Sequence, residues 1–563
     1  MTSPFFQQAP AMSNTFLADS LLQAYLEFSV PREIHIEIFN DLKRFGERAA
    51  GELLEQSLKA ENEPPVHIAF DPWGARIDRI QFSEAWKYLE KVAAEEGLIA
   101  IGYERKQKSF SRLYQFAKLF LFHPSSAFVS CPLAMTDGAA RALEVCGKPP
   151  ALKHVFDRLT SRNTNDFWTS GQWMTERTGG SDVSETSTIA KREGDHFALY
   201  GDKWFSSGTG SQTALALARI EGSASGSRGL SLFCVELRDQ NQNLKKIKVN
   251  RLKDKLGTNA LATAELSLEG TPAILLGEID QGVKSVSSML NVTRIYNSVC
   301  AIASSARAIA LAKDYAKKRK AFGKTLDSQP LHLQVLADLQ ANYEACFHLT
   351  FFVTKLLGKD ECGEISEAEK HLLRLLTPIV KLFTAKMSVA HASEILESFG
   401  GAGYCEDTGI PKILRDAQVF SIWEGTTNVL SLDLLRVLAK KESISCFQDY
   451  ISNMLSKIKN SKLQIGVKAT EKRMSDLSGF LKVAAQKNSE EYWQASSRNL
   501  AFNFAQIISA TLMFEFAEWC DQQSKLEGCI YTANRFALQE LTQRREIGAE
   551  TLSENLAILK LNE

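Results

Sequence analysis

The 563-residue chain carries 66 basic and 66 acidic side chains, so its formal net charge is zero. A balanced charge argues against a dominant electrostatic attraction to nucleic acid or to an anionic membrane. Hydrophobic residues make up 44% and charged residues 23% of the chain, which is typical of a globular protein, and this length requires several packed domains. Ten cysteines stand singly, with neither a CxxC pair nor a close Cys/His spacing, and the nine histidines form no HExxH, which predicts buried thiols and no metal site.

The amino-terminal segment contains no Lys or Arg before Arg32, the opposite of an Arg-rich presequence. The final residues Leu561-Asn562-Glu563 are not a peroxisomal address, and we find no apolar run long enough to cross a bilayer. We therefore expect a cytoplasmic protein with no membrane span, and a mitochondrial matrix location is the alternative.

Residues 1–165 are expected to form a helical domain. Apolar residues return at steps of three and four in the segments 34–58, 82–92 and 109–122, and the pair Pro64-Pro65 separates the first segment from the others. This spacing puts the apolar side chains on one face of each predicted helix.

Residues 166–280 are expected to form a β domain. Apolar residues there alternate or run in short segments that Gly, Asn and Asp separate, which is typical of strands. The clearest predicted strands are 197–200, 214–220, 230–235 and 264–268.

Helical spacing returns after Gly282. Segments 289–318, 331–357, 367–399 and 426–439 have the length of bundle helices, so residues 281–439 predict a second helical domain. Residues 440–563 are again helical in pattern, with an apolar stretch at 500–512, and predict an additional helical domain at the carboxyl end.

The segment 415–428 contains the most informative carboxylate of the chain. Glu424 follows Ile422 and Trp423 and precedes a Gly-Thr-Thr turn. A carboxylate in such surroundings is expected to lose part of its hydration, which suits it to removing a proton near neutral pH. The alternative is an ordinary capping loop, because Thr426 and the apolar run after Asn428 also fit the start of a helix.

Four further motifs accompany this segment in chain order, at 174–182, 201–207, 319–324 and 399–404. Together with the loop at Glu424 they resemble the acyl-CoA dehydrogenase superfamily. The segments 131–136 and 251–257 and the long tail beyond residue 438 resemble its AidB-like branch. The resemblance is clear over residues 60–440. It implies a helical amino-terminal domain, a β-barrel middle domain and a carboxyl-terminal helical bundle, with the tail as an extra helical domain.

The resemblance implies an FAD-dependent acyl-CoA dehydrogenase of fatty acid metabolism, which converts a saturated medium- to long-chain acyl-CoA into the trans-2-enoyl-CoA. In this interpretation Glu424 removes the α-proton and flavin N5 accepts the hydride. Arg294 matches the family arginine beside the base and the substrate, and its alternative is a surface arginine of the bundle. No residue pattern indicates the electron acceptor.

The same resemblance implies non-covalent FAD bound by two loops and by the segment around the base. Phe205 stands where the family more often has Trp, which keeps an aromatic surface but removes the indole donor. The residues of this expected flavin site are Met174, Thr175, Gly180, Ser181, Phe205, Ser207, Trp423, Thr426 and Asn428.

In the family a neighbouring subunit completes the flavin site, which implies a homo-oligomer, expected to be a tetramer. Arginine forks suit phosphate oxygens, and adjacent glycines allow close approach of the backbone. A glutamine usual after this element is displaced, because Gln329 comes one residue early and Pro330 takes its place. The residues that match the contact across subunits are Arg319, Phe322, Glu397, Gly400 and Gly401.

Two other functions stay open: a flavoprotein associated with nucleic acid, like bacterial AidB, and an acyl-CoA-sequestering protein with little turnover. Residues 440–563 contain 16 basic and 15 acidic side chains. DNA binding relies on clustered phosphate neutralisation, so this balance does not favour it, although small basic clusters at 457–462 and 468–473 keep it open.

Overall fold

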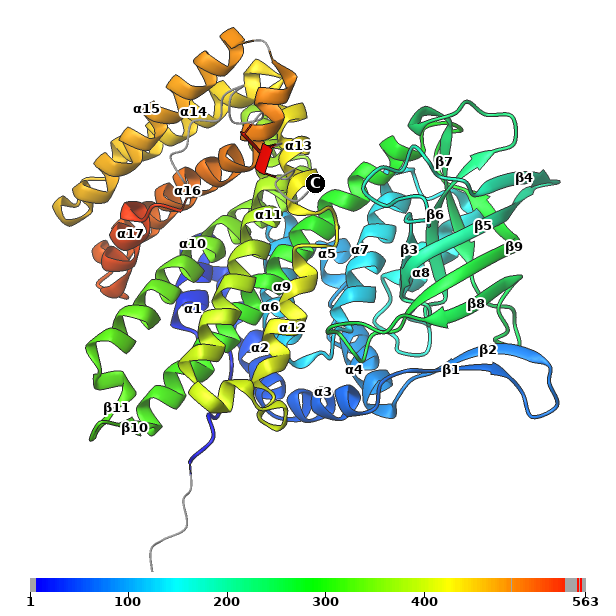
Figure 1. Cartoon of the computed structure of the whole chain (residues 1–563), viewed down its shortest axis with the longest axis horizontal. Coiled ribbons are helices and arrows are strands. Elements are labelled where there is room, and N and C mark those ends of the chain that lie inside the picture. Colours follow the sequence, from blue (N-terminus) through cyan, green and yellow to red (C-terminus); the bar gives the residue numbers. More distant parts are fainter. Residues whose placement is uncertain (1–6, 488, 542–553, 556, 559–563) are drawn as a thin grey trace, which may run out of the picture. The chain divides into compact units, whose positions relative to one another are not determined.

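The computed structural model of the protein describes residues 7–487, 489–541, 554–555 and 557–558 (Figure 1). The chain divides into two compact units. One is Asp41–Cys300, and the other combines Met1–Asn40 with Ala301–Glu563. Two long helices, α2 (Arg32–Ala50) and α9 (Gly282–Lys318), run through the boundaries between these units.

The first part of the Asp41–Cys300 unit is helical, as predicted. Arg44 and Lys118 bind the buried carboxylate of Glu96 at 2.5 and 2.7 Å, which ties α2 to the end of α4 and to α6. The helices are α3 (Glu52–Asn62), α4 (Glu84–Glu95), α5 (Ala100–Glu104), α6 (Ser111–Phe122), α7 (Ser130–Val145) and α8 (Lys153–Leu159).

A β-hairpin interrupts this helical region, and the sequence analysis did not predict it. Strands β1 (Val66–Phe70) and β2 (Arg76–Gln81) pair antiparallel. The buried carboxylate of Asp78 accepts a hydrogen bond from the backbone N–H of Val249, and the Arg76 guanidinium donates to the carbonyl of Val249. The hairpin is therefore anchored on strand β8, far away in the sequence, and local pattern does not reveal such an anchor.

The β domain is a sheet that closes on itself, because β6 pairs with β4 on one side and with β7 on the other. Its order is β3-β6-β4-β5-β9-β7, with β8 on β9, and Trp173, Phe197 and Phe233 fill its interior. This arrangement is a β-barrel and confirms the predicted fold class. The strands are β3 (Ser170–Trp173), β4 (Ile189–Glu193), β5 (His196–Ser207), β6 (Thr213–Ile220), β7 (Leu230–Glu236), β8 (Ile247–Leu252) and β9 (Thr263–Leu275).

The other unit is a helical bundle with the tail helices packed on it. Ser366 and Glu369 form a capping box that starts α11, and the Phe447 and Phe504 rings meet 4.9 Å apart. The elements are α1 (Ser20–Ser29), β10 (Lys320–Ala321), β11 (Lys324–Thr325), α10 (Pro330–Glu361), α11 (Glu367–Ser398), α12 (Ile410–Phe420), α13 (Thr427–Leu438), α14 (Lys441–Lys457), α15 (Gln464–Lys487), α16 (Glu490–Gln522) and α17 (Gly528–Leu538).

Two expectations from the sequence need correction. Helices α9 and α16 are long and apolar enough to cross a membrane by length and composition, which the sequence analysis did not expect, and their most apolar windows are 72% and 83% buried inside the structure. A core helix of a soluble protein passes the same test.

Six of the ten cysteines are buried, but Cys405 is exposed, so the expectation of buried thiols is wrong for that residue.

Candidate active site

Glu424 lies in the short turn between α12 and α13, with part of its surface exposed. Its backbone is left-handed, at φ +57°, and Gly425 follows at φ +98°. Such a conformation costs a residue with a side chain about 1–3 kcal/mol and persists only where neighbours impose it. Thr426 caps α13, since its hydroxyl accepts from the N–H of Val429 at 3.4 Å, so the predicted helix start is confirmed.

The neighbour that holds this turn is Lys381 of α11, which the sequence analysis missed. Its side chain is fully buried, and Nζ donates to the carbonyl oxygen of Gly425 at 2.6 Å. The sequence feature that could have identified it is a lysine inside the apolar run 378–383, because a buried charge needs a specific partner. Near Glu424, Trp423 is half-buried and Asn428 is exposed.

Arg294 lies in the helix α9 and is only 8% exposed, so the alternative of a surface arginine is wrong. It belongs to the Asp41–Cys300 unit, whereas Glu424 belongs to the other unit. Their approach to one another stays a prediction.

The loop after β3 is tied to β5 by a buried ion pair. Lys203 Nζ lies 2.7 Å from Glu176 Oε1, and both side chains are almost fully buried. The hydroxyls of Thr188 and Ser187 donate to the same carboxylate at 2.5 and 2.7 Å. Burial would raise the pKa of Glu176, but the Lys203 charge and these hydrogen bonds lower it overall. The sequence analysis included Glu176 only within the motif 174–182, and the structure shows that this carboxylate ties the loop to the residues just before β4 and to β5.

Within this loop Gly180 packs directly on Thr175. A Cβ at position 180 would approach the Thr175 hydroxyl oxygen to 2.7 Å, too close for any side chain. The carbonyl of Thr175 accepts from the N–H of Trp204 at 2.9 Å, which joins the loop to β5. The structure thus brings Thr175 and Gly180 together beside β5, while Met174 is buried and Ser181 is exposed.

A bulge in the pairing of β5 with β9 presents Phe205 to the outside. The register shifts between Lys203 and Ser206, and Phe205 adopts φ +55° with 59% of its surface exposed. Ser207 is buried, and its hydroxyl lies 3.0 Å from that of Thr263. The predicted aromatic surface is therefore present and accessible.

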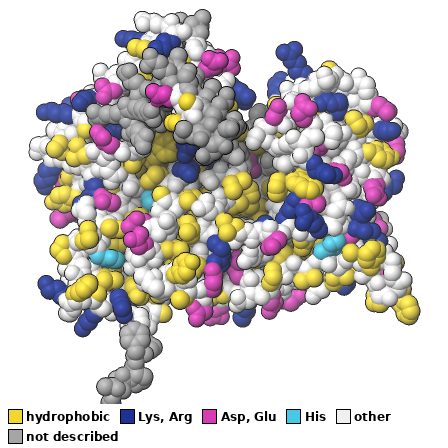
Figure 2. Space-filling view, viewed as in Figure 1, with side chains coloured by type: hydrophobic (Ala, Val, Ile, Leu, Met, Phe, Trp, Pro, Cys, Tyr) yellow, Lys and Arg dark blue, Asp and Glu magenta, His cyan; other side chains and the backbone are white. Residues whose placement is uncertain are grey.

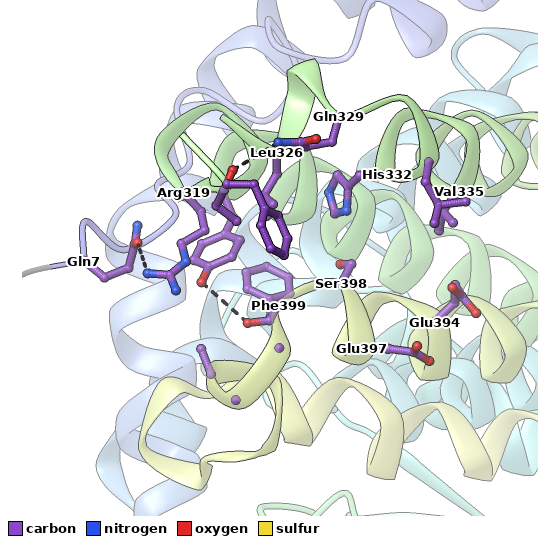
Figure 3. A pocket seen from close by; sticks show the side chains of 17 residues that line it. Gln7, Arg319, Leu326, Gln329, His332, Val335, Glu394, Glu397, Ser398 and Phe399 are labelled. Atoms are coloured by element: carbon purple, nitrogen blue, oxygen red, sulfur yellow. Dashed lines mark hydrogen bonds between the residues drawn. The ribbon is translucent and has the colours of Figure 1, made fainter. Parts of the chain in front are cut away.

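The five residues expected to reach a neighbouring subunit line one pocket of about 760 Å³ (Figure 3). Phe322 is 98% exposed at the tip of the β10–β11 hairpin, with φ +51° followed by Gly323 at φ +77°. Two successive positive φ values are those of a type I′ turn. The other predicted residues in this lining are Arg319, Glu397, Gly400 and Gly401.

The pocket also contains polar residues that the sequence analysis missed: Gln7, His332 and Glu394. Arg319 donates to the Gln7 side-chain oxygen at 3.3 Å. The displaced Gln329 lines the pocket too, but its side-chain nitrogen donates to the carbonyl of Ala321 at 3.0 Å and so stabilises the hairpin. No group of His, Cys, Asp and Glu that could hold a metal ion occurs among the described residues.

A barrel between helical regions, with a glutamate in a strained turn and glycine-rich loops, is the architecture of an acyl-CoA dehydrogenase. Family profiles agree: "Acyl-CoA dehydrogenase, C-terminal domain" matches residues 280–439 and "Acyl-CoA dehydrogenase, middle domain" residues 171–271. "Adaptive response protein AidB N-terminal domain" matches residues 7–166, and "Acyl-CoA dehydrogenase 11 C-terminal domain-like" residues 442–559.

Whole-chain comparisons agree with these profiles. Acyl-CoA dehydrogenase family member 11 of Caenorhabditis elegans is 42% identical over 96% of this chain and 90% of its own length. Putative acyl-CoA dehydrogenase AidB of Escherichia coli strain K12 is 32% identical over 70% of this chain and 72% of its own length. The crystal structure of C. elegans ACDH-11 in complex with C11-CoA is 40% identical and superposes with a TM-score of 0.96, covering 100% of this chain and 98% of that one.

The chain therefore belongs to the acyl-CoA dehydrogenase family, in its AidB-like branch. It is an oxidoreductase that acts on acyl-CoA, and its family binds FAD non-covalently.

Proposed function

We propose that the protein oxidises a saturated medium- to long-chain acyl-CoA to the trans-2-enoyl-CoA, with Glu424 as the base. The observation that carries this proposal is the strained turn at Glu424. The next residue in this turn is Gly425, and its carbonyl oxygen accepts a hydrogen bond from the buried Lys381. The C11-CoA complex of the C. elegans relative supports the acyl chain length.

Two features of the chain fit FAD. Gly180 is exposed and has no side chain, so a ligand can approach its backbone closely. The pocket around Arg319 contains a buried imidazole nitrogen, Nε2 of His332, that has no hydrogen-bond partner among the described residues. When bound, FAD supplies the hydride acceptor that no side chain can provide.

The chain's own residues remove the α-proton and stabilise the charge on the thioester oxygen. An α-proton becomes removable only when a base is positioned at it and donors stabilise the negative charge that develops on the thioester oxygen. We assign the first role to the carboxylate of Glu424 and the second to its backbone N–H. Arg294 lies beside the substrate in this proposal, and Phe205 and Ser207 border the flavin.

The pocket at Arg319 leads us to propose a homotetramer, because in this family such a pocket holds the cofactor of an adjacent subunit. Sedimentation of the purified protein measures this directly. A monomer that retains FAD at nanomolar concentration would contradict the proposed assembly.

The decisive experiment is Glu424→Gln. The protein is expected to purify yellow, and acyl-CoA should bleach the wild-type flavin under anaerobic conditions. The variant keeps the shape of the side chain but cannot accept a proton, so acyl-CoA should bind while bleaching slows by about 10²-fold or more. Glu442→Gln, an exposed position on α14, is the matched control and should bleach at the wild-type rate.

Other outcomes identify other functions. Wild-type protein that binds acyl-CoA without bleaching would indicate sequestration. Tight duplex DNA binding with a steep salt dependence would favour the nucleic-acid function. On the face shown in Figure 2, Lys and Arg lie interspersed with Asp and Glu among the described residues, which therefore form no extended basic surface there.

A further inference from the structure

The pocket in the helical unit has two sides of opposite charge. Arg319 lies on the side of the β10–β11 hairpin, next to Gln7, and Glu394 and Glu397 line the side formed by α11 (Figure 3). The two glutamates are three residues apart on one helix and therefore share a face. A ligand that spans the pocket meets a cation at one end and two carboxylates at the other.

Arg319 is the only cation among the described residues that line the pocket. Burial lowers the pKa of His332, so this imidazole is neutral at physiological pH and can donate or accept one hydrogen bond. Glu394 is half-buried and Glu397 is exposed. With both carboxylates ionised, the lining carries one more negative than positive charge. A ligand with a second phosphate group at its α11 end would therefore be repelled by the two glutamates.

Phe322 supplies an exposed aromatic ring to the same pocket. Tyr315 and Phe399 also line the cavity, but their rings lie 4.6 Å apart, are almost fully buried and form its floor. An exposed aromatic face can stack on a nucleobase in a sequence-tolerant way. The pocket thus combines one exposed aromatic ring, one cation and two acceptor carboxylates, which together fit an adenosine diphosphate whose ribose donates hydrogen bonds.

We propose that Glu394 and Glu397 make this pocket selective for an adenosine 5′-diphosphate group with a free ribose diol, and reject a ribose that carries a 3′-phosphate. An ionised carboxylate only accepts hydrogen bonds, so it pairs with ribose hydroxyls. A phosphate offers only acceptors and is repelled by the same carboxylates. The selectivity comes from the repulsive pair as much as from the attractive contacts.

This inference rests on the proposed function, because that function requires the protein to handle two adenosine ligands. The ADP half of FAD has a free diol, whereas coenzyme A carries a 3′-phosphate on the same ribose. Without discrimination, abundant acyl-CoA would compete for the cofactor pocket. The two glutamates prevent this competition by repelling the 3′-phosphate on the ribose of coenzyme A.

The test compares two nucleotides by calorimetric titration of the full-length protein freed of FAD: ADP, and adenosine 3′-phosphate 5′-diphosphate. Wild type should bind ADP tighter by about tenfold or more, the order expected for like charges across a partly solvated pocket. In Glu394→Gln/Glu397→Gln the preference should fall to about threefold or less, chiefly because the 3′-phosphorylated nucleotide binds tighter. Glu471→Gln/Asp476→Asn, which removes two negative charges at exposed positions of α15, should keep the wild-type preference.

Raising the salt concentration should narrow the wild-type preference and change that of the double variant less, since the variant lacks the two carboxylates whose repulsion of the 3′-phosphate is screened. If the double variant loses its helical circular dichroism, Glu394→Gln alone answers the same question. Equal binding of both nucleotides by wild type, or an unchanged preference in the folded variant, would overturn the proposal. Wild type that binds neither FAD nor ADP would overturn the proposed function as well.

Discussion

Replacing Lys381 by Met tests whether the buried lysine holds the Glu424 turn in its reactive conformation. Methionine keeps the length of the aliphatic stem but removes the donor that binds the Gly425 carbonyl at 2.6 Å. A hydrogen bond from a charged donor contributes about 1.5–3 kcal/mol. That range matches the cost of about 1–3 kcal/mol for the left-handed backbone of Glu424.

Because the two energies are similar, losing the bond should allow the turn to relax into other conformations. A loss of about 1.5–3 kcal/mol lowers the competent population roughly 10- to 100-fold. We therefore expect Lys381→Met to retain FAD and to slow anaerobic flavin bleaching by acyl-CoA by about that factor. Glu424→Gln should be slower still.

The control for this prediction is Lys370→Met on the same helix, where the exposed Lys370 forms an ion pair with the exposed Glu367 at 2.6 Å. Its bleaching rate should stay within about twofold of wild type, since exposed ion pairs contribute little. A folded, FAD-loaded Lys381→Met protein with the wild-type rate would refute the role of the lysine as a positioning residue for the turn.

Three further predictions concern the other site elements. Glu176→Gln should lower the free energy of unfolding by about 3–5 kcal/mol, because it leaves Lys203 charged and buried without a counter-ion, and an unchanged urea midpoint would contradict this. Burial would raise the pKa of Glu96, but hydrogen bonds and charges such as that of Arg44 hold it at about 2 instead of 4.5. Its stabilisation, about 3 kcal/mol, is thus complete above pH 4.5 and lost as the pH falls toward 2, and urea titrations of wild type and Glu96→Gln across that window should converge at low pH. Arg319→Glu should reduce the FAD-to-protein ratio after gel filtration, and an unchanged ratio would remove Arg319 from the cofactor site.

Most long elements could be predicted from sequence because their periodicity extends over many residues. The predicted helix 367–399 is α11 (Glu367–Ser398), and the predicted strand 214–220 lies in β6 (Thr213–Ile220). The β1–β2 hairpin could not be predicted in this way. Its strands are five and six residues long, and Asp78 anchors it on Val249, 171 residues further along the chain.

The same distinction applies to the site. Glu424, Arg319 and Gly180 belong to contiguous motifs, so a resemblance identifies them directly. Lys381 acts on a carbonyl 44 residues away, and only the packing of α11 against the turn reveals it. His332 was hidden for another reason, because its significance lies in a buried Nε2 that has no hydrogen-bond partner among the described residues, and only the folded surroundings show this.

Backbone strain alone does not mark the functional residues of this chain, because positive φ values occur at several other described residues. Phe128 has φ +65° and is 5% exposed, so its ring is packed in the core and the packing itself accounts for the strain. Phe205 and Phe322 have similar φ values, but their rings are 59% and 98% exposed. The Phe205 ring gains only partial packing, since its centroid lies 4.8 Å from Lys253 Nζ and 6.4 Å from that of Trp204, and Phe322 is almost fully exposed. Core packing therefore accounts for the strained backbone of Phe128, but not for that of the two residues that the sequence analysis places at the cofactor.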